Sequence, residues 1–308
     1  MTTKKYIIET VLCCPSCKGD LRIVDSYMVC LSCNSNYEFF NGIPILLPNK
    51  IDDETKFIKS RYESSSGEGS PNAVLPMAAN MLGSVRDLTV LDIGCGRGDF
   101  ERQYLLPQMP KLVIAIDFAL SALQDAITKT NLGSNILFVM GDIQNLPIKS
   151  ATFDRVVVTE VVEHVPDQHK AFNELSRVIK PEGEIILSTP NYFNPAGILK
   201  KIMDKFYYKG KEKWTYVNPE AFERFQTFRS IQKSLYENGL DVKEYRGSEF
   251  YLGIHQLFTF PIHTLDKFIY YILCKISLFN RKFFTLLPFK IFGVVQCYKL
   301  KKSENNIG

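Results

Sequence analysis

At Val90-Leu91-Asp92-Ile93-Gly94-Cys95-Gly96-Arg97-Gly98-Asp99-Phe100, an apolar run ends in three glycines at alternate positions, and a helix-compatible segment follows. Glycine has no Cβ, so the backbone can turn sharply there and approach a ligand closely. A strand, a glycine-rich turn and a helix, in this order, build a nucleotide site at the carboxyl end of the first strand of an α/β sheet. The stretch therefore predicts a nucleotide-like cofactor at this turn.

Apolar strand-like runs alternate with helical patterns from residue 89 onward. Strands are expected near 89–93, 112–117, 136–140, 153–159, 183–189, 241–246 and 291–300, and helices near 98–106, 119–130, 168–179 and 219–238. This alternation predicts a Rossmann-like α/β fold with a seven-stranded, mostly parallel sheet and helices on both faces. We expect this domain to span residues 85–308, with insertions at about 195–217 and 250–288.

Acidic residues follow the next two predicted strands. Asp117 lies about 20 residues beyond the glycines, a distance at which a carboxylate accepts hydrogen bonds from ribose hydroxyls. Asp142 and Ile143 follow the third strand, where a carboxylate and an apolar side chain could bind and cover an adenine ring. A single acidic residue after a strand is common, but Asp92, Asp117 and Asp142 at consecutive strand ends form a constellation.

These motifs, together with residues 153–167 and 179–184, resemble the class I S-adenosylmethionine-dependent methyltransferases over roughly residues 85–190. The resemblance implies that the glycine turn holds the methionine part of S-adenosylmethionine, Asp117 the ribose, and Asp142 with Ile143 the adenine. The full set expected at the cofactor is Asp92, Gly94, Cys95, Gly96, Gly98, Asp117, Phe118, Asp142, Ile143, Thr159 and Glu160. A dinucleotide dehydrogenase is the competing interpretation, but the spacing is G-x-G-x-G rather than G-x-G-x-x-G.

Three residues after the fourth strand are candidates for catalysis: Glu160, Glu163 and His164. Two carboxylates and an imidazole can bind Mg²⁺, which would polarise a hydroxyl acceptor. Alternatively, His164 is a general base, or Glu160 only orients the cofactor or caps a turn. The Glu-x-x-Glu-His pattern resembles metal-assisted O-methyltransferases that make ubiquinone precursors or methylate plant small RNAs. His255 and His263 are further candidates, with core or surface positions as the alternative.

Cysteine pairs near the N-terminus, Cys14-Pro15-Ser16-Cys17 and Cys30-Leu31-Ser32-Cys33, have the spacing of two zinc knuckles. Four thiolates suit a closed, tetrahedral, structural Zn²⁺ site. Metal-free buried thiols are the alternative, and Cys13 is interpreted as apolar filler. With residues 37–48, this region resembles the small zinc-ribbon proteins that activate tRNA and protein methyltransferases. We expect a zinc-ribbon module at 1–50, with a structural or docking role.

Residues 51–84 are expected to form a linker and an N-terminal helix. A helix near 55–62 precedes the polar run 64–71, which either folds over the ligand or is a plain linker. The net charge of +4 is mild, so composition alone does not indicate nucleic-acid binding. No signal peptide or membrane span is predicted, and eight cysteines without a secretory signal favour a cytoplasmic protein.

The insertions are expected to select the acceptor. Asn191 and Tyr192 line its pocket or simply form a turn, and residues 197–217 are rich in lysine and aromatic residues. Residues 264–284 have one apolar and one basic helical face, which predicts either a lid or peripheral contact with the inner face of a membrane. We favour O-methylation of a hydrophobic or lipid-linked small molecule. An RNA methyltransferase is the second choice, and a non-catalytic adaptor is less favoured.

Overall fold

The computed structural model describes residues 2–64, 74–130, 135–193, 226–248 and 295–303. Among these residues, seven strands form the predicted sheet in the order β7-β6-β5-β8-β9-β11-β10. Strands β5 to β9 pair in parallel, and β11 is antiparallel to β9 and β10. The bounds are β5 (Thr89–Ile93), β6 (Leu112–Asp117), β7 (Ile136–Gly141), β8 (Phe153–Thr159), β9 (Ile179–Pro190), β10 (Leu240–Ser248) and β11 (Val295–Lys302). The predicted Rossmann-like, mostly parallel fold is confirmed.

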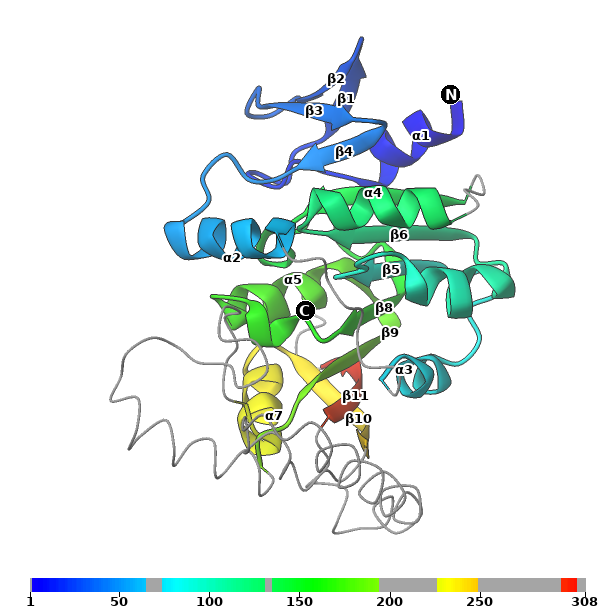
Figure 1. Cartoon of the computed structure of the whole chain (residues 1–308), viewed down its shortest axis with the longest axis vertical. Helices are drawn as coiled ribbons and strands as arrows, with labels where there is room; N and C mark the ends of the chain where they lie inside the picture. Colours follow the sequence, from blue (N-terminus) through cyan, green and yellow to red (C-terminus); the bar gives the residue numbers. More distant parts are fainter. Residues whose placement is uncertain (1, 65–73, 131–134, 194–225, 249–294, 304–308) are drawn as a thin grey trace, which may run out of the picture.

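Helices cover both faces of this sheet (Figure 1). Because side chains alternate along a strand, Leu91 and Ile93 of β5 pack in one apolar cluster with Phe172, while Val90 packs in a second cluster with Leu123. The helices are α5 (Gln168–Val178) and α7 (Phe228–Glu237) on the first face, and α3 (Val74–Leu82) and α4 (Leu120–Lys129) on the second. The sheet is therefore buried on both sides, which explains its nearly continuous apolar strands.

The glycine turn follows β5, the central strand from which the chain continues to β6 on one side and later to β8 on the other. Such a switch point leaves a crevice at the carboxyl ends of the strands. Gly94 has φ +73, and an added Cβ would lie 2.2 Å from Val161 Cγ2. Gly98 has φ +75, and its added Cβ would crowd Thr130 Oγ1 at 3.1 Å. Glycine is thus required at these positions both by conformation and by space.

The helix predicted at 98–106 is present but is not a regular α-helix. It contains a π-helical turn at Glu101–Leu105, in which Leu106 N–H donates to Glu101 O, and a 3-10 turn at Leu106–Gln108 follows. Pro107 has no N–H to donate, so a regular helix ends there. Glu101, the first residue of the π turn, is fully buried.

The N-terminal module lies at one end of the molecule (Figure 1). It comprises α1 (Thr2–Val11), β1 (Leu21–Val24), β2 (Tyr27–Cys30), β3 (Asn36–Phe40) and β4 (Ile43–Leu46). Strand β4 pairs in parallel with β7, with Ile45 opposite Met140 and Leu46 opposite Gly141. The module therefore extends the main sheet beyond its predicted edge, a connection that the sequence did not reveal.

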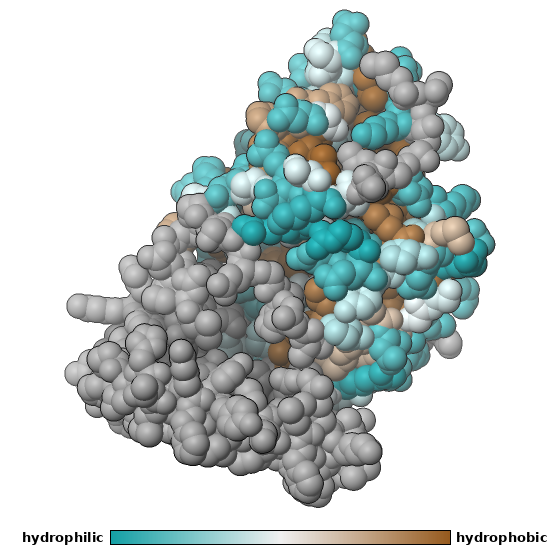
Figure 2. Space-filling model, turned by 45° about the vertical axis from the view of Figure 1, so that its right-hand side comes forward, coloured by the Kyte–Doolittle hydropathy of each residue, from teal (hydrophilic) through white to brown (hydrophobic). Residues whose placement is uncertain are grey.

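Two helices lie between the module and β5. Helix α2 (Asp53–Ser64) matches the helix expected near 55–62, whereas α3 was not predicted. Both insertions, the 264–284 amphipathic pattern, His255 and His263 lie outside the described residues. Within the described ranges, no helix is long and apolar enough to cross a bilayer. The described surface in Figure 2 is largely hydrophilic, with hydrophobic residues in small separate areas.

Candidate active site

A cavity of about 760 Å³ opens at the carboxyl ends of β5, β6, β7 and β8. Most residues predicted to bind the cofactor line it: Asp92, Gly94, Cys95, Gly96, Asp117, Phe118, Asp142, Ile143, Thr159 and Glu160, together with the candidate base His164. Gly98 and Glu163 are not among the lining residues. Gly98 instead packs against α4, and Glu163 is buried beside the cavity. Helix α2, whose role the sequence left open, contributes Thr55, Ile58, Tyr62 and Glu63 to the wall.

Asp117 at the end of β6 fixes the glycine turn. Its Oδ2 accepts a hydrogen bond from Gly96 N–H at 2.8 Å, and its Oδ1 accepts one from Ala119 N–H at 2.8 Å. Burial is the main cause of a raised pKa for Asp117, which these two donors counteract. Each carboxylate oxygen has a second acceptor position. Asp117 can therefore hold the turn and still accept a hydroxyl of a bound sugar.

Asp142 at the end of β7 is held by a residue that the sequence analysis missed. Its Oδ1 accepts the N–H of Gln144 at 2.9 Å and caps the 3-10 turn Ile143–Asn145. The Gln144 amide also lies 3.3 Å from both Asp142 oxygens, and its Oε1 accepts the N–H of Asp167 at 3.0 Å. Gln144 thus ties the turn after β7 to the start of α5. Such a role depends on tertiary contacts and leaves no motif in the sequence.

Asp92 supplies the third predicted acidic group. It is only 1 % exposed, and neither of its carboxylate oxygens has a hydrogen-bond partner among the described residues. A buried carboxyl without a partner is costly unless a ligand or a proton compensates it. The cavity therefore combines glycine backbone with acidic groups at three strand ends. One of these three, Asp92, has no compensating partner among the described residues. This arrangement fits a cationic adenosyl ligand such as S-adenosylmethionine.

Glu160 occupies a strained position where β8 ends. Its φ is 56°, a left-handed conformation that costs a non-glycine residue energy and that clusters at functional sites. Its Oε1 accepts a hydrogen bond from Ser188 Oγ at 2.8 Å, and its backbone N–H donates to Ser188 O. The neighbouring strand β9 therefore holds Glu160 at the cavity wall.

Glu163 and His164 form a pair beside the same cavity. His164 Nε2 lies 3.7 Å from Glu163 Oε1, and the His164 ring meets the Tyr62 ring edge-on at 5.6 Å between centroids. Glu163 is 1 % exposed, and its Oε2 accepts a hydrogen bond from Thr189 Oγ1 at 3.0 Å. In turn, Thr189 Oγ1 lies 2.8 Å from Gln226 Oε1. The Thr189 hydroxyl thus fixes one carboxylate oxygen of Glu163, and the other oxygen faces the His164 imidazole.

The Mg²⁺ prediction finds no support in this arrangement. Among the described residues, the four predicted cysteines are the only metal-type group whose ligand atoms all lie within 4.8 Å of one another. Glu160, Glu163 and His164 do not gather in this way, because the two carboxylates bond to Ser188 and Thr189 of β9. Acid–base chemistry is the other interpretation of Glu160, Glu163 and His164.

The cysteine cluster is built from two matching turns. Lys18 N–H donates to Cys14 O at 2.8 Å, and Asn34 N–H donates to Cys30 O at 3.0 Å. Lys18 and Asn34 both have positive φ, at 63° and 57°. Each turn presents two thiols, and the sulfur atoms of Cys14, Cys17, Cys30 and Cys33 all lie within 4.8 Å of one another, close enough to bind one Zn²⁺ ion together. Cys13 is buried outside this cluster, as predicted, and burial raises its pKa to about 11.

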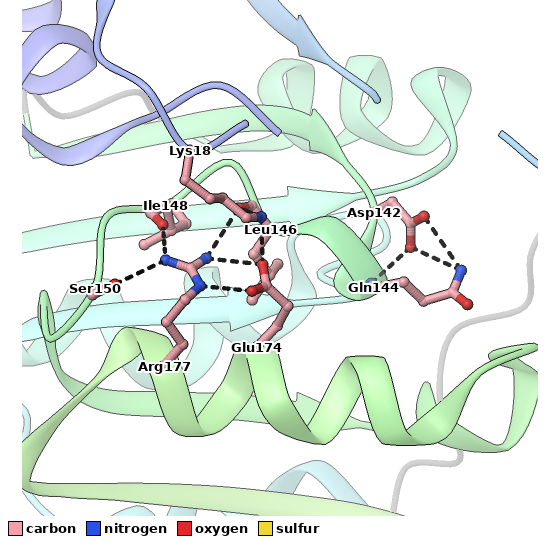
Figure 3. Close-up of polar contacts among 8 residues, drawn as sticks. All are labelled: Lys18, Asp142, Gln144, Leu146, Ile148, Ser150, Glu174 and Arg177. Atoms are coloured by element: carbon pink, nitrogen blue, oxygen red, sulfur yellow. Dashed lines mark hydrogen bonds and ion pairs between the residues drawn. The ribbon is translucent and has the colours of Figure 1, made fainter. Parts of the chain in front are cut away.

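The first cysteine turn also contacts the segment that leads away from the cavity (Figure 3). Lys18 Nζ donates to Glu174 Oε2 at 2.7 Å and to Leu146 O at 3.0 Å. Arg177 pairs with Glu174 and donates to Leu146 O and Ile148 O. Leu146 directly follows the 3-10 turn that carries Gln144. The N-terminal module and α5 therefore brace the segment beside Asp142.

Comparison with known proteins agrees with this geometry. Residues 91–187 match the family described as "Methyltransferase domain". The chain is 31% identical over 165 residues to a ubiquinone biosynthesis O-methyltransferase of Rickettsia canadensis, covering 53% of this chain and 66% of that protein. It is 29% identical over 171 residues to a demethylmenaquinone methyltransferase of Staphylococcus carnosus, covering 51% and 70% respectively. The chain thus spans about two thirds of the length of these relatives.

A solved complex of the Haloferax volcanii Trm112 methyltransferase activator with a methyltransferase shares the fold. It has a TM-score of 0.53 at 14% identity and covers 81% of this chain and 93% of the matched chain. The matching domain and the methyltransferase relatives, together with the cofactor-type cavity, define the class: residues 91–187 form a methyltransferase domain of the S-adenosylmethionine-dependent kind. In this chain, the glycine turn and the acids at the ends of β6 and β7 line the cavity.

Proposed function

We propose that this chain transfers the methyl group of S-adenosylmethionine to an oxygen atom of a hydrophobic or lipid-linked small molecule. The observation that carries the proposal is the Glu163–His164 pair, because a base lies beside the cavity that fits the cofactor. The names of the two relatives above, a ubiquinone biosynthesis O-methyltransferase and a demethylmenaquinone methyltransferase, support a hydrophobic acceptor.

When bound, S-adenosylmethionine would supply an electrophilic methyl group on a positively charged sulfur. The residues of the chain would hold the two reactants in line and would remove one proton from the acceptor. Much of the rate enhancement comes from holding the reactants in line. The glycine turn, Asp117 and Asp142 would orient the cofactor. Helix α2 would cover it, since Tyr62 and Glu63 line the cavity wall.

His164 would remove the proton of the acceptor hydroxyl as the new bond forms. General-base assistance of this kind contributes about 10²–10⁴-fold in rate. Glu163 would orient the imidazole and stabilise the positive charge that His164 gains. The Thr189 hydroxyl donates to Glu163 and holds that carboxylate in place, and Gln226 lies against the same hydroxyl, so both residues act on catalysis through Glu163.

We assign the cysteine cluster a structural role, with Zn²⁺ held by Cys14, Cys17, Cys30 and Cys33. A module this small depends on bound metal for much of its folding free energy. Its contacts at β7 and Leu146 support a role in bracing the methyltransferase domain. The basic amphipathic pattern at 264–284 suits contact with a bilayer that holds a lipid-linked acceptor.

The test is to incubate the purified chain with S-adenosylmethionine and separate pools of polyprenylated phenols, small phenols and total RNA. Mass spectrometry would then locate any added methyl group. We expect a methyl ether on a phenolic acceptor, lost in His164→Ala while binding of S-adenosylmethionine is retained. Methylated nucleosides without a methylated phenol would instead favour an RNA methyltransferase. No methyl transfer with any pool, by a chain that binds the cofactor, would contradict the proposed acceptor class.

A further inference from the structure

Two carboxyl groups are buried side by side next to the glycine turn, and no donor group of another described residue bonds to either of them. Asp92 lies at the end of β5, and Glu101 begins the π-helical turn, with exposed fractions of 1 % and 0 %. None of their four oxygen atoms has a partner outside the pair among the described residues. Asp92 lines the cavity, whereas Glu101 is not among the lining residues and lies behind the turn. The proposed function assigns no role to Glu101.

The groups that most strongly influence this pair electrostatically are also acidic. Asp117 on β6 acts on both Asp92 and Glu101, and Asp99 in the glycine turn acts on Glu101. Glu63 of α2 acts in turn on Asp117, and the buried Cys95 thiol is also close to the pair. The two arginines of this segment bind other acids: Arg97 pairs with Asp125 at 3.4 Å, and Arg102 pairs with Asp99. Among the described residues, these arginines thus pair with other acids, and no cation is among the main influences on the pair.

Two adjacent buried carboxylates cannot both remain ionised without a compensating charge. Burial, followed by the charge of Glu101, raises the pKa of Asp92 well above its usual range. Burial raises the pKa of Glu101 to about 7. Near neutral pH, the ligand-free pair consequently retains a proton, which the two groups share. The titration belongs to the pair rather than to one residue.

The backbone supports a functional origin for this arrangement. Glu101 is the first residue of the π turn, in which the N–H of Leu106 bonds to Glu101 O, five residues back. π turns are rare, and they occur frequently at functional sites. The buried acid of the pair thus stands at the start of such a turn, directly behind the glycine turn.

We propose that Asp92 and Glu101 form a proton-sharing pair that exchanges its proton for the positive charge of the bound cofactor. The O–H bond of the shared proton breaks, the proton passes to solvent, and the freed carboxylate electron pair faces the ligand cation. Asp92 meets the ligand, and Glu101 is a positioning residue that acts through Asp92. The inference rests on the proposed function, because S-adenosylmethionine is the cation invoked.

Calorimetric titration of the full chain with S-adenosylmethionine tests this exchange. At each pH from 6 to 8, the titration is run in phosphate and in imidazole, which both buffer in this range and whose heats of ionisation differ. We expect the binding enthalpy near pH 6 to 7 to depend on the buffer by an amount that corresponds to about one released proton. Affinity should rise by up to about tenfold per pH unit below the pKa of the pair and level off above it.

Glu101→Gln removes the shared proton but keeps the size of the side chain. We expect this variant to release far less proton and to have a flatter affinity profile. Glu244→Gln, which removes a partly exposed carboxylate paired with Arg246 on β10, should behave as the unchanged chain. If Glu101→Gln does not fold, the buffer comparison on the unchanged chain still decides the question.

A buffer-independent enthalpy in the unchanged chain, with clear binding of S-adenosylmethionine, would overturn the proton exchange and leave the proposed function intact. Equal proton release by Glu101→Gln and the unchanged chain would also overturn it, since Glu101 would then have no part. Absence of S-adenosylmethionine binding at every pH would instead contradict the proposed function itself.

Discussion

The cysteine cluster and the cavity at the sheet edge are both candidate ligand sites, but they are built in opposite ways. The cysteine cluster consists of two local turns with matching hydrogen bonds and four identical ligand types. The cavity draws its residues from four strands and from α2, and its main acids come from β5, β6 and β7. Spacing in the sequence therefore specifies the first site almost completely, whereas the second exists only once the sheet has formed.

This difference also predicts how the two sites respond to mutation. Loss of one cysteine removes a ligand that nothing else can replace, so the module should fail as a unit. Loss of one acid at the sheet edge leaves the strands in place, because they are held by buried apolar clusters on both faces. Mutations in the module should therefore reduce stability, and mutations in the cavity should mainly reduce binding or rate.

The largest effect is expected from Cys14→Ser. It should abolish bound Zn²⁺ and melt the N-terminal module, since structural zinc contributes on the order of 10 kcal/mol to folding in small zinc peptides. Metal analysis and thermal unfolding in the presence and absence of a chelator measure both effects. Cys13→Ala is the matched control and should retain the metal, because Cys13 lies outside the cluster. Full zinc content in Cys14→Ser would contradict the assigned ligand set.

His164→Ala comes next. It should lower kcat by about 10²–10⁴-fold and change the affinity for S-adenosylmethionine by less than about threefold, because the base acts on the acceptor. The matched control is His169→Ala on α5, where the ring bonds to Asn238 and does not line the cavity. Steady-state rates and equilibrium binding separate the two effects. An unchanged kcat in His164→Ala would contradict the assignment of His164 as the general base.

Asp117→Ala should weaken binding of S-adenosylmethionine by about 10- to 100-fold, since hydrogen bonds to a charged group are each worth roughly 1.5–3 kcal/mol. It also frees the N–H of Gly96, so part of the loss reflects a less ordered glycine turn. Equilibrium dialysis with labelled cofactor gives the affinity, and Asp241→Asn on β10 serves as the control. Affinity equal to that of the control would exclude Asp117 from the site.

Lys18→Ala should have the smallest effect, about 1–2 kcal/mol of unfolding free energy, because it leaves the buried Glu174 with Arg177 alone. Exposed Lys56, paired with Asp53 at 2.8 Å on α2, offers a control: Lys56→Ala should cost much less unfolding free energy, because solvent screens an exposed ion pair. Denaturant unfolding compares the two variants. Equal losses would mean that the bracing seen in Figure 3 adds no stability.

Local patterns in the sequence predicted most of the fold. All seven strands of the main sheet occur within a few residues of their predicted ranges, because most of them contain an apolar run between clear turn signals. The pairing of β4 with β7 was not predicted, because parallel partners far apart in sequence share no pattern. Helices α1 and α3 were also missed, since each is short and lacks a distinct start signal.

Those residues of the candidate site that belong to a sequence motif could be predicted. Asp117 and Asp142 follow strands, and both line the cavity. Glu101, Gln144 and Thr189 could not be found in this way. An acid within a helical segment normally faces water, and only the π turn and its packing bury Glu101. Gln144 and Thr189 act through hydrogen bonds to residues on other elements, which the sequence does not display.

Crystals of the chain soaked with S-adenosylmethionine test the central claim most directly. The account predicts electron density in the cavity, with the ribose against Asp117, the adenine beside Asp142 and Ile143, and the methionine part over the glycine turn. Density for the ligand elsewhere on the surface, or a cavity that binds a nicotinamide dinucleotide and leaves S-adenosylmethionine in solution, would contradict it.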